Sequence, residues 1–387
     1  MDSKKLAAAV QPDVVTFRRE LHAHPELSFQ EIETTDRIAA ALEALGLTVT
    51  RFEPTGLMAD IKGGKPGKMV GLRADIDALP VTEHTGLPFA SAVPGVMHAC
   101  GHDTHAAMLY GAAKALCSVK EELPGTVRLL FQPAEEIVKG AKALVQQGAL
   151  DGVDMLFGQH IIGMMPVGVI GVAAGPSAAA SDAFVIKVHG KGCHGAMPDT
   201  GVDATLAASA IVVGLQSIVS REIAPAEPAV VTVGKLVSGT KGNIISGEAE
   251  MEGTVRTFDR ALRKTMPDRI TRIAKDIASA YRCTADVEYE FSVDVLINDE
   301  AATAVAAAAA KKVVAAPAML LQNLPRQMGA EDFADYTAKV PASFAILGGG
   351  GEYPQHSDKF CIDEAAFETG VAFLVQAAWD FLAGAQG

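Results

Sequence analysis

The sequence predicts an α/β protein in which a larger domain with a mixed sheet contains a smaller, inserted α+β domain. Three observations predict this fold class. Short apolar runs alternate with helical stretches towards both ends of the chain, as in sheets covered by helices on both faces. The middle of the chain follows the order β-α-β-β-α-β, which is the ferredoxin-like arrangement. The length of 387 residues also favours two domains over one.

The outer parts of the chain contain the elements of the larger domain. Two helices are expected within residues 12–45, around a turn at His24 and Pro25. Apolar strands are expected at residues 69–74, 126–131, 154–157 and 343–347, and helices at 105–118 and 139–147. Because these elements come from both ends of the chain, we expect residues 1–181 and 296–387 to form one discontinuous domain.

The inserted domain is expected at residues 182–295. Its strands are predicted at residues 184–189, 229–236, 248–258 and 284–293, and its helices at 204–219 and 260–281. Apolar and polar residues alternate in the last of these strands, as in antiparallel sheets that leave one face to solvent or to a partner. An exposed edge of this sheet could pair two copies into a homodimer.

Composition narrows the classes of function. The formal net charge of −13 argues against nucleic acid or an anionic membrane as the main partner, because both are bound through basic surfaces. Five scattered cysteines form no disulfide framework and favour a reducing compartment. The start of the chain lacks the apolar core of a signal peptide. No apolar run is expected to span a bilayer, since the nearest, at residues 301–310, ends at two lysines. We therefore expect a cytoplasmic protein.

Polar side chains follow the predicted strands of the outer domain. They are Asp75 and Asp77, Glu135 and Glu136, His160, and His356, and the run from Met97 to His105 adds Cys100 and His102 just before a helix. In open α/β sheets, ligands bind beyond the carboxyl ends of the strands. We therefore expect these side chains to converge.

Five of these side chains could bind metal directly: Cys100, His102, Glu136, His160 and His356. Five ligands are more than one tetrahedral structural zinc binds. They suit two ions ~4 Å apart that share a bridging ligand. The neighbouring glutamates fit a divided role, in which one binds metal and the other stays free as a general base. These carboxylates also have purely structural explanations, without any chemical role. Glu135 and Glu136 could begin a helix, and Asp75 and Asp77 could form a turn.

At this point the sequence resembles a known family. The motifs that carry the resemblance are RRELHAHPELSFQE (18–31), RADIDALP (73–80), MHACGHDTH (97–105), FQPAEE (131–136), GQH (158–160), HGAMPDTGVDA (194–204), GAEDF (329–333) and QHSDKF (355–360). Together they resemble the M20 metallopeptidase family, in particular its amidohydrolase branch of hippurate hydrolases, aminoacylases, N-acetyldiaminopimelate deacetylases and auxin-conjugate hydrolases. The resemblance covers nearly the whole chain.

The resemblance implies a zinc-peptidase-like catalytic domain with an inserted lid or dimerisation domain. It implies two divalent ions, with manganese favoured and zinc, cobalt or nickel possible, bound by the five side chains named above. Glu135 would be the general base, and Asp77 would support the metal cluster. In the inserted domain, His194 would help hold the substrate's carbonyl oxygen, and Asn243 and Arg256 could contact the oxyanion or the substrate carboxylate.

The chain departs from the family pattern at several positions. Cys193 replaces a usual glycine, Asp199 stands where histidine is frequent, and Ser246 replaces a usual proline. Asp75 stands where the wider family has a metal-binding histidine, so it is not counted as a ligand. These departures leave the chemistry in place and affect the expected details of the pocket.

The expected function is hydrolysis of the amide bond of N-acyl amino acids, of the hippurate or N-acetyl amino acid type, to a carboxylate and a free amino acid. One alternative is a carboxypeptidase or dipeptidase of the same superfamily. The other is a metal-stabilised binding or structural protein, in which Glu135 would have no chemical role.

Overall fold

The computed structural model describes residues 1–384, which form two compact units. Unit 1 comprises Met1–Ser177, Ile297–Pro325 and Asp332–Gly387, as far as residue 384, and unit 2 comprises Ala178–Leu296 and Arg326–Glu331. Each unit has its own cluster of buried apolar side chains. Unit 1 is a mixed α/β structure, which confirms the fold class expected from the alternation of apolar runs and helices.

Unit 1 is built on an eight-stranded mixed sheet in the order β1-β2-β4-β3-β5-β16-β6-β15. The strands are β1 (Val49–Arg51), β2 (Leu57–Lys62), β3 (Lys65–Asp75), β4 (Pro124–Gln132), β5 (Met155–Ile162), β6 (Ile170–Gly171), β15 (Leu320–Leu321) and β16 (Ala342–Gly348). The four central strands, β4, β3, β5 and β16, are parallel to their neighbours among them. Their carboxyl ends therefore meet at one edge of the sheet.

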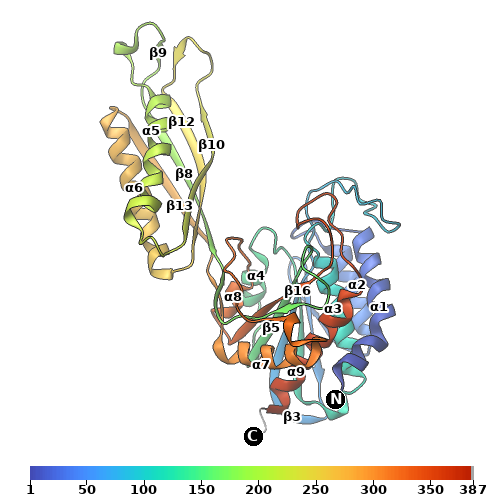
Figure 1. Cartoon of the computed structure of the whole chain (residues 1–387). Coiled ribbons are helices and arrows are strands. Elements are labelled where there is room, and N and C mark those ends of the chain that lie inside the picture. Colours follow the sequence, from blue (N-terminus) through green and yellow to red (C-terminus); the bar gives the residue numbers. More distant parts are fainter. Residues whose placement is uncertain (385–387) are drawn as a thin grey trace. The chain divides into compact units, whose positions relative to one another are not determined.

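Helices pack around this sheet (Figure 1). They are α1 (Ser3–Ala23), α2 (Ile32–Glu43), α3 (His102–Cys117), α4 (Gly140–Gln146), α7 (Glu300–Val313), α8 (Ala334–Thr337) and α9 (Ala366–Gly384). Helices α1, α3 and α9 pack closely on one another. This approach requires a glycine, because a Cβ at Gly111 would lie 2.4 Å from Val14 Cγ2 and 3.0 Å from Val371 Cγ2.

Two expectations about unit 1 were wrong in their bounds. Helix α1 begins at Ser3, where Asp2 accepts a hydrogen bond from the Lys5 N–H, and not near residue 12. Pro12 lies inside the helix, although proline normally marks a first turn. Strand β5 continues to Ile162, so that His160 lies within the strand and does not follow its end.

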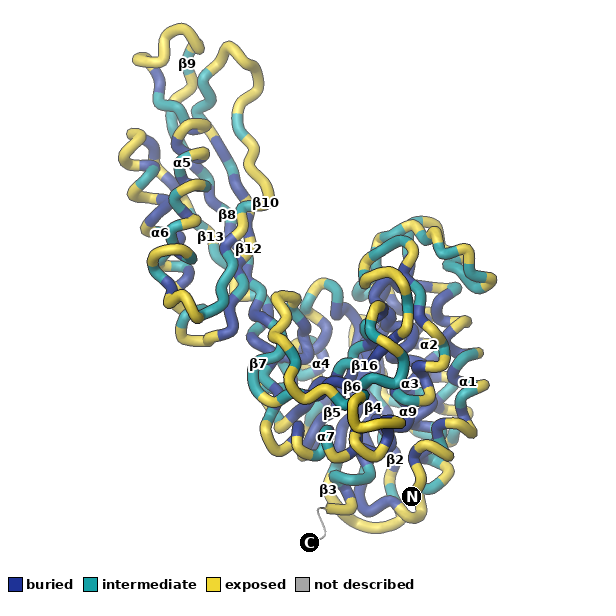
Figure 2. Tube along the Cα trace, viewed as in Figure 1, coloured by how far each residue is buried: buried dark blue, intermediate teal, exposed yellow. Residues whose placement is uncertain are grey.

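Unit 2 has the connectivity β-α-β-β-α-β that the sequence predicts. Its main strands are β8 (Ala180–His189), β10 (Ala229–Ser238), β12 (Glu248–Thr257) and β13 (Thr284–Val293), in the antiparallel order β10-β12-β8-β13, with helices α5 (Ala204–Ser217) and α6 (Arg260–Ala280). Buried and half-buried residues alternate along β8, because one face packs against the helices. Figure 2 shows buried inner sides and exposed outer sides on α5 and α6.

Two further pairs of short strands complete the fold. Strand β9 (Cys193–His194) pairs with β11 (Ile244–Ile245), and β7 (Gly175–Ala178) pairs with β14 (Leu296–Asn298).

One helical stretch, Ala204–Glu222, is long and apolar enough to span a bilayer by length and composition alone. From the sequence, residues 301–310 were instead expected to be the stretch nearest to such a run. Core helices of soluble proteins have the same length and composition. Ala207, Ile211 and Leu215 of this stretch are buried in the core of unit 2.

Candidate metal centre

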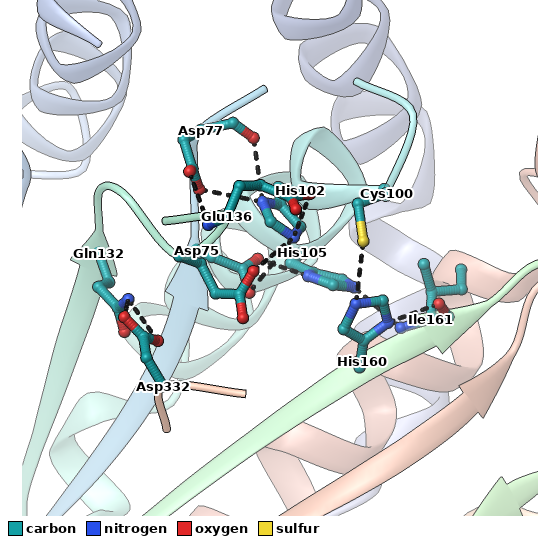
Figure 3. A network of polar contacts seen from close by, with 12 residues as sticks. Asp75, Asp77, Cys100, His102, His105, Gln132, Glu136, His160, Ile161 and Asp332 are labelled. Carbon is teal, nitrogen blue, oxygen red and sulfur yellow. Dashed lines mark hydrogen bonds and ion pairs between the residues drawn. The ribbon is translucent and has the colours of Figure 1, made fainter. Parts of the chain in front are cut away.

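Residues that the sequence singles out converge at the carboxyl edge of the central strands of unit 1, and Figure 3 shows Asp75, Asp77, Cys100, His102, Glu136 and His160 there. Asp75 ends β3, and Asp77 follows it. Glu135 and Glu136 lie in the turn after β4, and His102 is the first residue of α3. A further segment carries His356, whose backbone N–H donates to the carbonyl oxygen of Ala99 at 2.7 Å.

The five predicted metal ligands lie close together in two overlapping groups. Potential ligand atoms of Cys100, His102 and His160 all lie within 4.8 Å of one another, and so do those of Cys100, Glu136 and His356. Cys100 Sγ is 3.4 Å from His160 Nε2, and His356 Nε2 is 3.5 Å from Glu136 Oε2. Because Cys100 belongs to both groups, its sulfur is placed as a shared ligand for two ions would be.

The hydrogen bonds of two histidines leave the same nitrogen available for a metal. His102 Nδ1 faces the carbonyl oxygen and the Oδ1 atom of Asp77, at 3.0 and 3.1 Å, and His160 Nδ1 faces the carbonyl oxygen of Ile161 at 2.7 Å. A carbonyl oxygen only accepts, so in each ring Nδ1 carries a proton, and Nε2 is the nitrogen that can offer a lone pair to a metal. This is the arrangement in which outer partners orient metal-binding histidines.

Two buried atoms at the centre have no hydrogen-bond partner among the described residues. They are His102 Nε2 and Glu136 Oε1, which lie 3.8 Å apart. A buried polar atom without a partner is costly. Two such atoms facing one another, beside a thiol and two further imidazoles, fit a set of donors for a divalent cation.

The pKa shifts at this centre are those expected of a buried site that a bound cation would balance. Burial raises the pKa of the Cys100 thiol and of the Glu136 carboxyl, and it lowers the pKa of His160 to about 3. Burial also acts to lower the pKa of His102, but the charge of Asp75 and the hydrogen bond to Asp77 outweigh it, so that this pKa is raised. A bound cation would favour the thiolate and the carboxylate and would displace the His102 proton.

Asp77 connects two of the ligands. Its Oδ1 atom holds His102, while its Oδ2 atom accepts hydrogen bonds from the Glu136 N–H at 3.0 Å and from Ser28 Oγ at 2.7 Å. The side chain is 1% exposed. Asp77 therefore contacts two of the predicted metal ligands, and its role as their support stays a prediction of the family resemblance.

His105 also supports the centre and is not available as a ligand. The Ile161 N–H donates to His105 Nε2 at 2.8 Å, so that His105 Nδ1 carries the proton and donates to Asp75 Oδ1 at 2.6 Å. Asp75 in turn accepts from Arg73 at 2.7 Å. This buried chain links β3 to the backbone beside His160, and it gives Asp75 a structural role.

A second buried cluster ties the start of α3 to α1. Asp103 Oδ2 accepts from Arg18 Nε and from His22 Nδ1, both at 2.8 Å. Burial alone would raise the pKa of Asp103, but Arg18 and His22 outweigh it and hold the pKa well below its usual range. The cluster fixes the helix whose first residue is His102.

The predicted residues of the inserted domain lie in unit 2 at two separate places. His194 pairs with Ile244, and the N–H of Gly195 donates to the carbonyl oxygen of Asn243 at 2.8 Å, so His194 and Asn243 are neighbours. Both are exposed. Asn243 precedes the first residue of β12, whereas Arg256 lies near its last residue. At ~3.3 Å per residue, Arg256 is therefore roughly 25 Å along the strand from that first residue. Arg256 is half-buried.

Two of the departures from the family pattern, Ser246 and Cys193, have local contacts. Ser246 Oγ donates to the carbonyl oxygen of Glu248 at 2.7 Å and so closes the turn before β12. Cys193 packs against Gly201, where a Cβ would lie 2.4 Å from its sulfur. Asp199 is exposed, and nothing in the structure explains its presence.

Ser28 and Glu31 support the centre, and reasoning from the sequence assigned them no role. Ser28 reaches Asp77, and Glu31 accepts a hydrogen bond from the N–H of Ala134 at 2.9 Å. Their only sequence signal is their place in the motif at residues 18–31.

Comparisons with known proteins agree with this geometry. Residues 71–380 match the model of peptidase family M20/M25/M40. The chain is 41% identical to an N-acetylcysteine deacetylase of Bacillus subtilis, over 94% of this chain and 96% of the relative. It is 40% identical to thermostable carboxypeptidase 1 of Saccharolobus solfataricus, over 92% of each chain.

A solved structure extends the similarity. A Bacillus subtilis protein described as a dinuclear metal-binding peptidase from the M20 family is 38% identical and has a TM-score of 0.87, over 97% of this chain and 99% of that one. The match to the family model spans most of the chain, and these relatives are similar along nearly their whole length. The chain therefore belongs to peptidase family M20/M25/M40.

Proposed function

We propose that this protein is a metal-dependent amidohydrolase that cleaves N-acyl amino acids to a carboxylate and a free amino acid. The observation that carries the proposal is the convergence of five metal-binding side chains beside a second glutamate, Glu135. The similarity to an N-acetylcysteine deacetylase supports this substrate class.

Cys100, His102, Glu136, His160 and His356 are the residues that would hold two divalent ions. Bound ions of this kind polarise a carbonyl group and make water more acidic. The imidazoles and the thiol suit zinc by their softness, whereas the family resemblance favours manganese. We propose two divalent ions per subunit, with manganese slightly ahead of zinc.

Glu135 is proposed as the general base. A carboxylate oxygen of Glu135 is 3.8 Å from His102 Nε2, so it lies beside the ligands. Its side chain would accept the proton of the attacking water and then deliver that proton to the leaving amine. Asp77 would hold His102 and Glu136 in place during this cycle.

Residues of unit 2 are proposed to contact the substrate. His194 would donate to the carbonyl oxygen of the scissile amide, with Asn243 as its neighbour, because oxyanion stabilisation needs fixed donors. Arg256 lies near the far end of β12, too far from His194 to contact the same substrate molecule at ~3.3 Å per strand residue, so its contact with the substrate carboxylate is not part of this proposal. Burial lowers the pKa of Arg256, but an arginine stays charged at neutral pH.

Two finer features are also part of the proposal. Strand β10 is an edge of the unit 2 sheet, and its Leu236 and Val237 are exposed, as are Leu206 and Val213 of α5. This apolar edge supports a homodimer formed through unit 2. Five cysteines without disulfides support a reducing, cytoplasmic location.

The proposal is tested by a substrate panel. The purified protein, loaded with manganese or with zinc, is assayed for release of free amine from N-acetyl amino acids, N-benzoylglycine and dipeptides. We expect the highest kcat/KM for one of the N-acyl amino acids. Preference for dipeptides would favour the carboxypeptidase or dipeptidase alternative, and metal-loaded protein without any hydrolysis would favour a binding protein.

A further inference from the structure

Glu31 is a buried carboxylate that is neither one of the predicted metal ligands nor one of the predicted catalytic groups. Its side chain is fully buried. One oxygen accepts from Thr55 Oγ1 at 2.6 Å and the other from the backbone N–H of Ala134 at 2.9 Å. Glu31 thereby joins the start of α2, the segment before β2 and the turn after β4.

The turn that Glu31 contacts has an uncommon backbone. Ala134 has a φ of +54°, a left-handed conformation that costs an L-residue other than glycine steric energy. The turn is also tight, because a Cβ at Gly140 would lie 1.6 Å from the carbonyl oxygen of Pro133. Such a conformation persists only where the surroundings enforce it.

This turn leads directly into the two glutamates of the site. The next residues after Ala134 are Glu135 and Glu136, the proposed base and a proposed metal ligand. The Glu136 N–H is held by Asp77, and Asp77 is held by Ser28. Residues 28–31 therefore reach this turn at both ends, directly through Glu31 and indirectly through Ser28.

Keeping a carboxyl group in this place is unfavourable in itself. Burial raises the pKa of Glu31 to about 7, although the hydrogen bonds from Thr55 and from the backbone partly offset this. A carboxyl group without a compensating role would be replaced at no loss by an apolar side chain of similar size.

We propose that Glu31 is a positioning residue, which holds Ala134 in its left-handed conformation and thereby fixes the directions of the Glu135 and Glu136 side chains. The effect on the two glutamates rests on the proposed function. The effect on the backbone of Ala134 is independent of that function and has its own measurement.

The test compares five variants of the full-length, metal-loaded protein. Glu31→Leu removes the acceptor, and Glu31→Gln retains an amide oxygen for the Ala134 N–H. Thr55→Val is the matched control, because it removes the other hydrogen bond of the same carboxylate. Glu31→Leu combined with Ala134→Gly places a residue that tolerates positive φ in the turn, with Ala134→Gly alone as its reference.

Two readouts are taken from each variant. Hydrogen–deuterium exchange of residues 131–139 reports on the Ala134 N–H, and steady-state kinetics separates kcat from KM. In Glu31→Leu we expect faster exchange in this segment and a kcat lower by roughly 10- to 100-fold at a nearly unchanged KM, as small misplacements of catalytic groups give. Glu31→Gln and Thr55→Val should resemble the wild type, and Ala134→Gly should restore part of the kcat of Glu31→Leu.

Three results would overturn the proposal. They are unchanged exchange of residues 131–139 in Glu31→Leu, an equal loss of kcat in Thr55→Val, and no recovery of kcat by Ala134→Gly. If no variant, including the wild type, hydrolyses an N-acyl amino acid, the proposed function fails while the exchange experiment still decides the role of Glu31. If Glu31→Leu does not fold, the same exchange comparison is made with Glu31→Ser, which is too short to reach Ala134.

Discussion

At the scale of single residues, hydrogen bonds separate metal ligands from their supports. The rings of His102 and His160 donate from Nδ1, so that Nε2 is the nitrogen left to bind a metal, on the side of Cys100 and Glu136. In His105 both ring nitrogens are engaged, by Asp75 and by the Ile161 N–H. The sequence places all three histidines near the site but cannot assign these roles, because the tautomer depends on partners from other segments.

A pair of variants checks this distinction. His105→Phe should keep both metal ions and lower the free energy of unfolding by roughly 2–3 kcal/mol, because a hydrogen bond to a charged group is lost and a buried N–H is left unpaired. His102→Phe should lose metal. Elemental analysis and denaturant unfolding measure the two effects. Loss of metal from His105→Phe at intact folding would contradict the assignment.

The base is tested by Glu135→Gln. The variant should bind two ions as the wild type does, because Glu135 is not among the proposed ligands. Its kcat should fall by at least ~10²-fold, the lower end of contributions from general acid–base catalysis. Turnover and metal content are measured on the same sample. Near-normal turnover at full metal content would exclude Glu135 as the base.

Glu31 gives a pH dependence with a definite sign. Its pKa rises from 4.5 in the unfolded chain to about 7 in the folded protein. Below 4.5 both states are protonated. As the pH rises towards 7, the unfolded state loses its proton first, so the folded state loses stability, by up to about 3 kcal/mol at ~1.36 kcal/mol per pH unit.

The measurement is urea unfolding of metal-free wild type and Glu31→Gln between pH 4.5 and 8. The other titrating groups are common to both proteins, so the difference in unfolding free energy isolates Glu31. The wild type should lose stability relative to the variant as the pH rises through this window. A difference that is independent of pH would mean that Glu31 titrates normally.

At the scale of secondary-structure elements, the bounds of a strand were predicted correctly where they depend on the residues of the strand itself, and wrongly where they depend on contacts with distant segments. Strand β13 occupies residues 284–293 as predicted, because its alternation of apolar and polar residues is visible in the sequence. Strand β5 was predicted to stop at residue 157, before Gly158, Gln159 and His160. The strand continues because Gln159 is buried beside Met108 and β16 pairs along it, and neither contact is visible locally.

The same limit explains which part of the site was predictable. The ligands stand in motifs, so their residue types and spacing were informative. Ser28 and Glu31 act through a carboxylate and a backbone N–H that are far away in sequence. The bridge between Leu27 and Ala78 and the packing of α2 against β1 and β2 bring them there.

The packing of α1, α3 and α9 predicts the effect of a larger side chain at Gly111. Gly111→Val should destabilise the protein by at least ~2 kcal/mol, because its side chain would overlap Val14 and Val371 in a core that cannot expand freely. Thermal unfolding measures this. The control on the same helix is Lys114→Ala, which removes a partly exposed ion pair with Asp13 and should cost less than about 1 kcal/mol. Equal effects of both variants would contradict a tight helix contact.

At the scale of the whole molecule, the two units differ in what stabilises them. Each has a separate apolar core, but all five proposed metal ligands belong to unit 1. A ligand stabilises the folded state that binds it, by an amount that grows with its concentration relative to Kd. Removing the metal should therefore weaken unit 1 and leave unit 2 unchanged.

Differential scanning calorimetry of metal-loaded and chelator-treated protein tests this. We expect two transitions, of which only one moves to lower temperature when the metal is removed. Met251→Ala identifies the other transition, because Met251 is buried in the core of unit 2 and its truncation should cost about 2–5 kcal/mol. One single transition that shifts as a whole on metal removal would show that the units unfold together. A shift of the transition that Met251→Ala identifies would instead place the metal's stabilising effect in unit 2, which carries His194, Asn243 and Arg256.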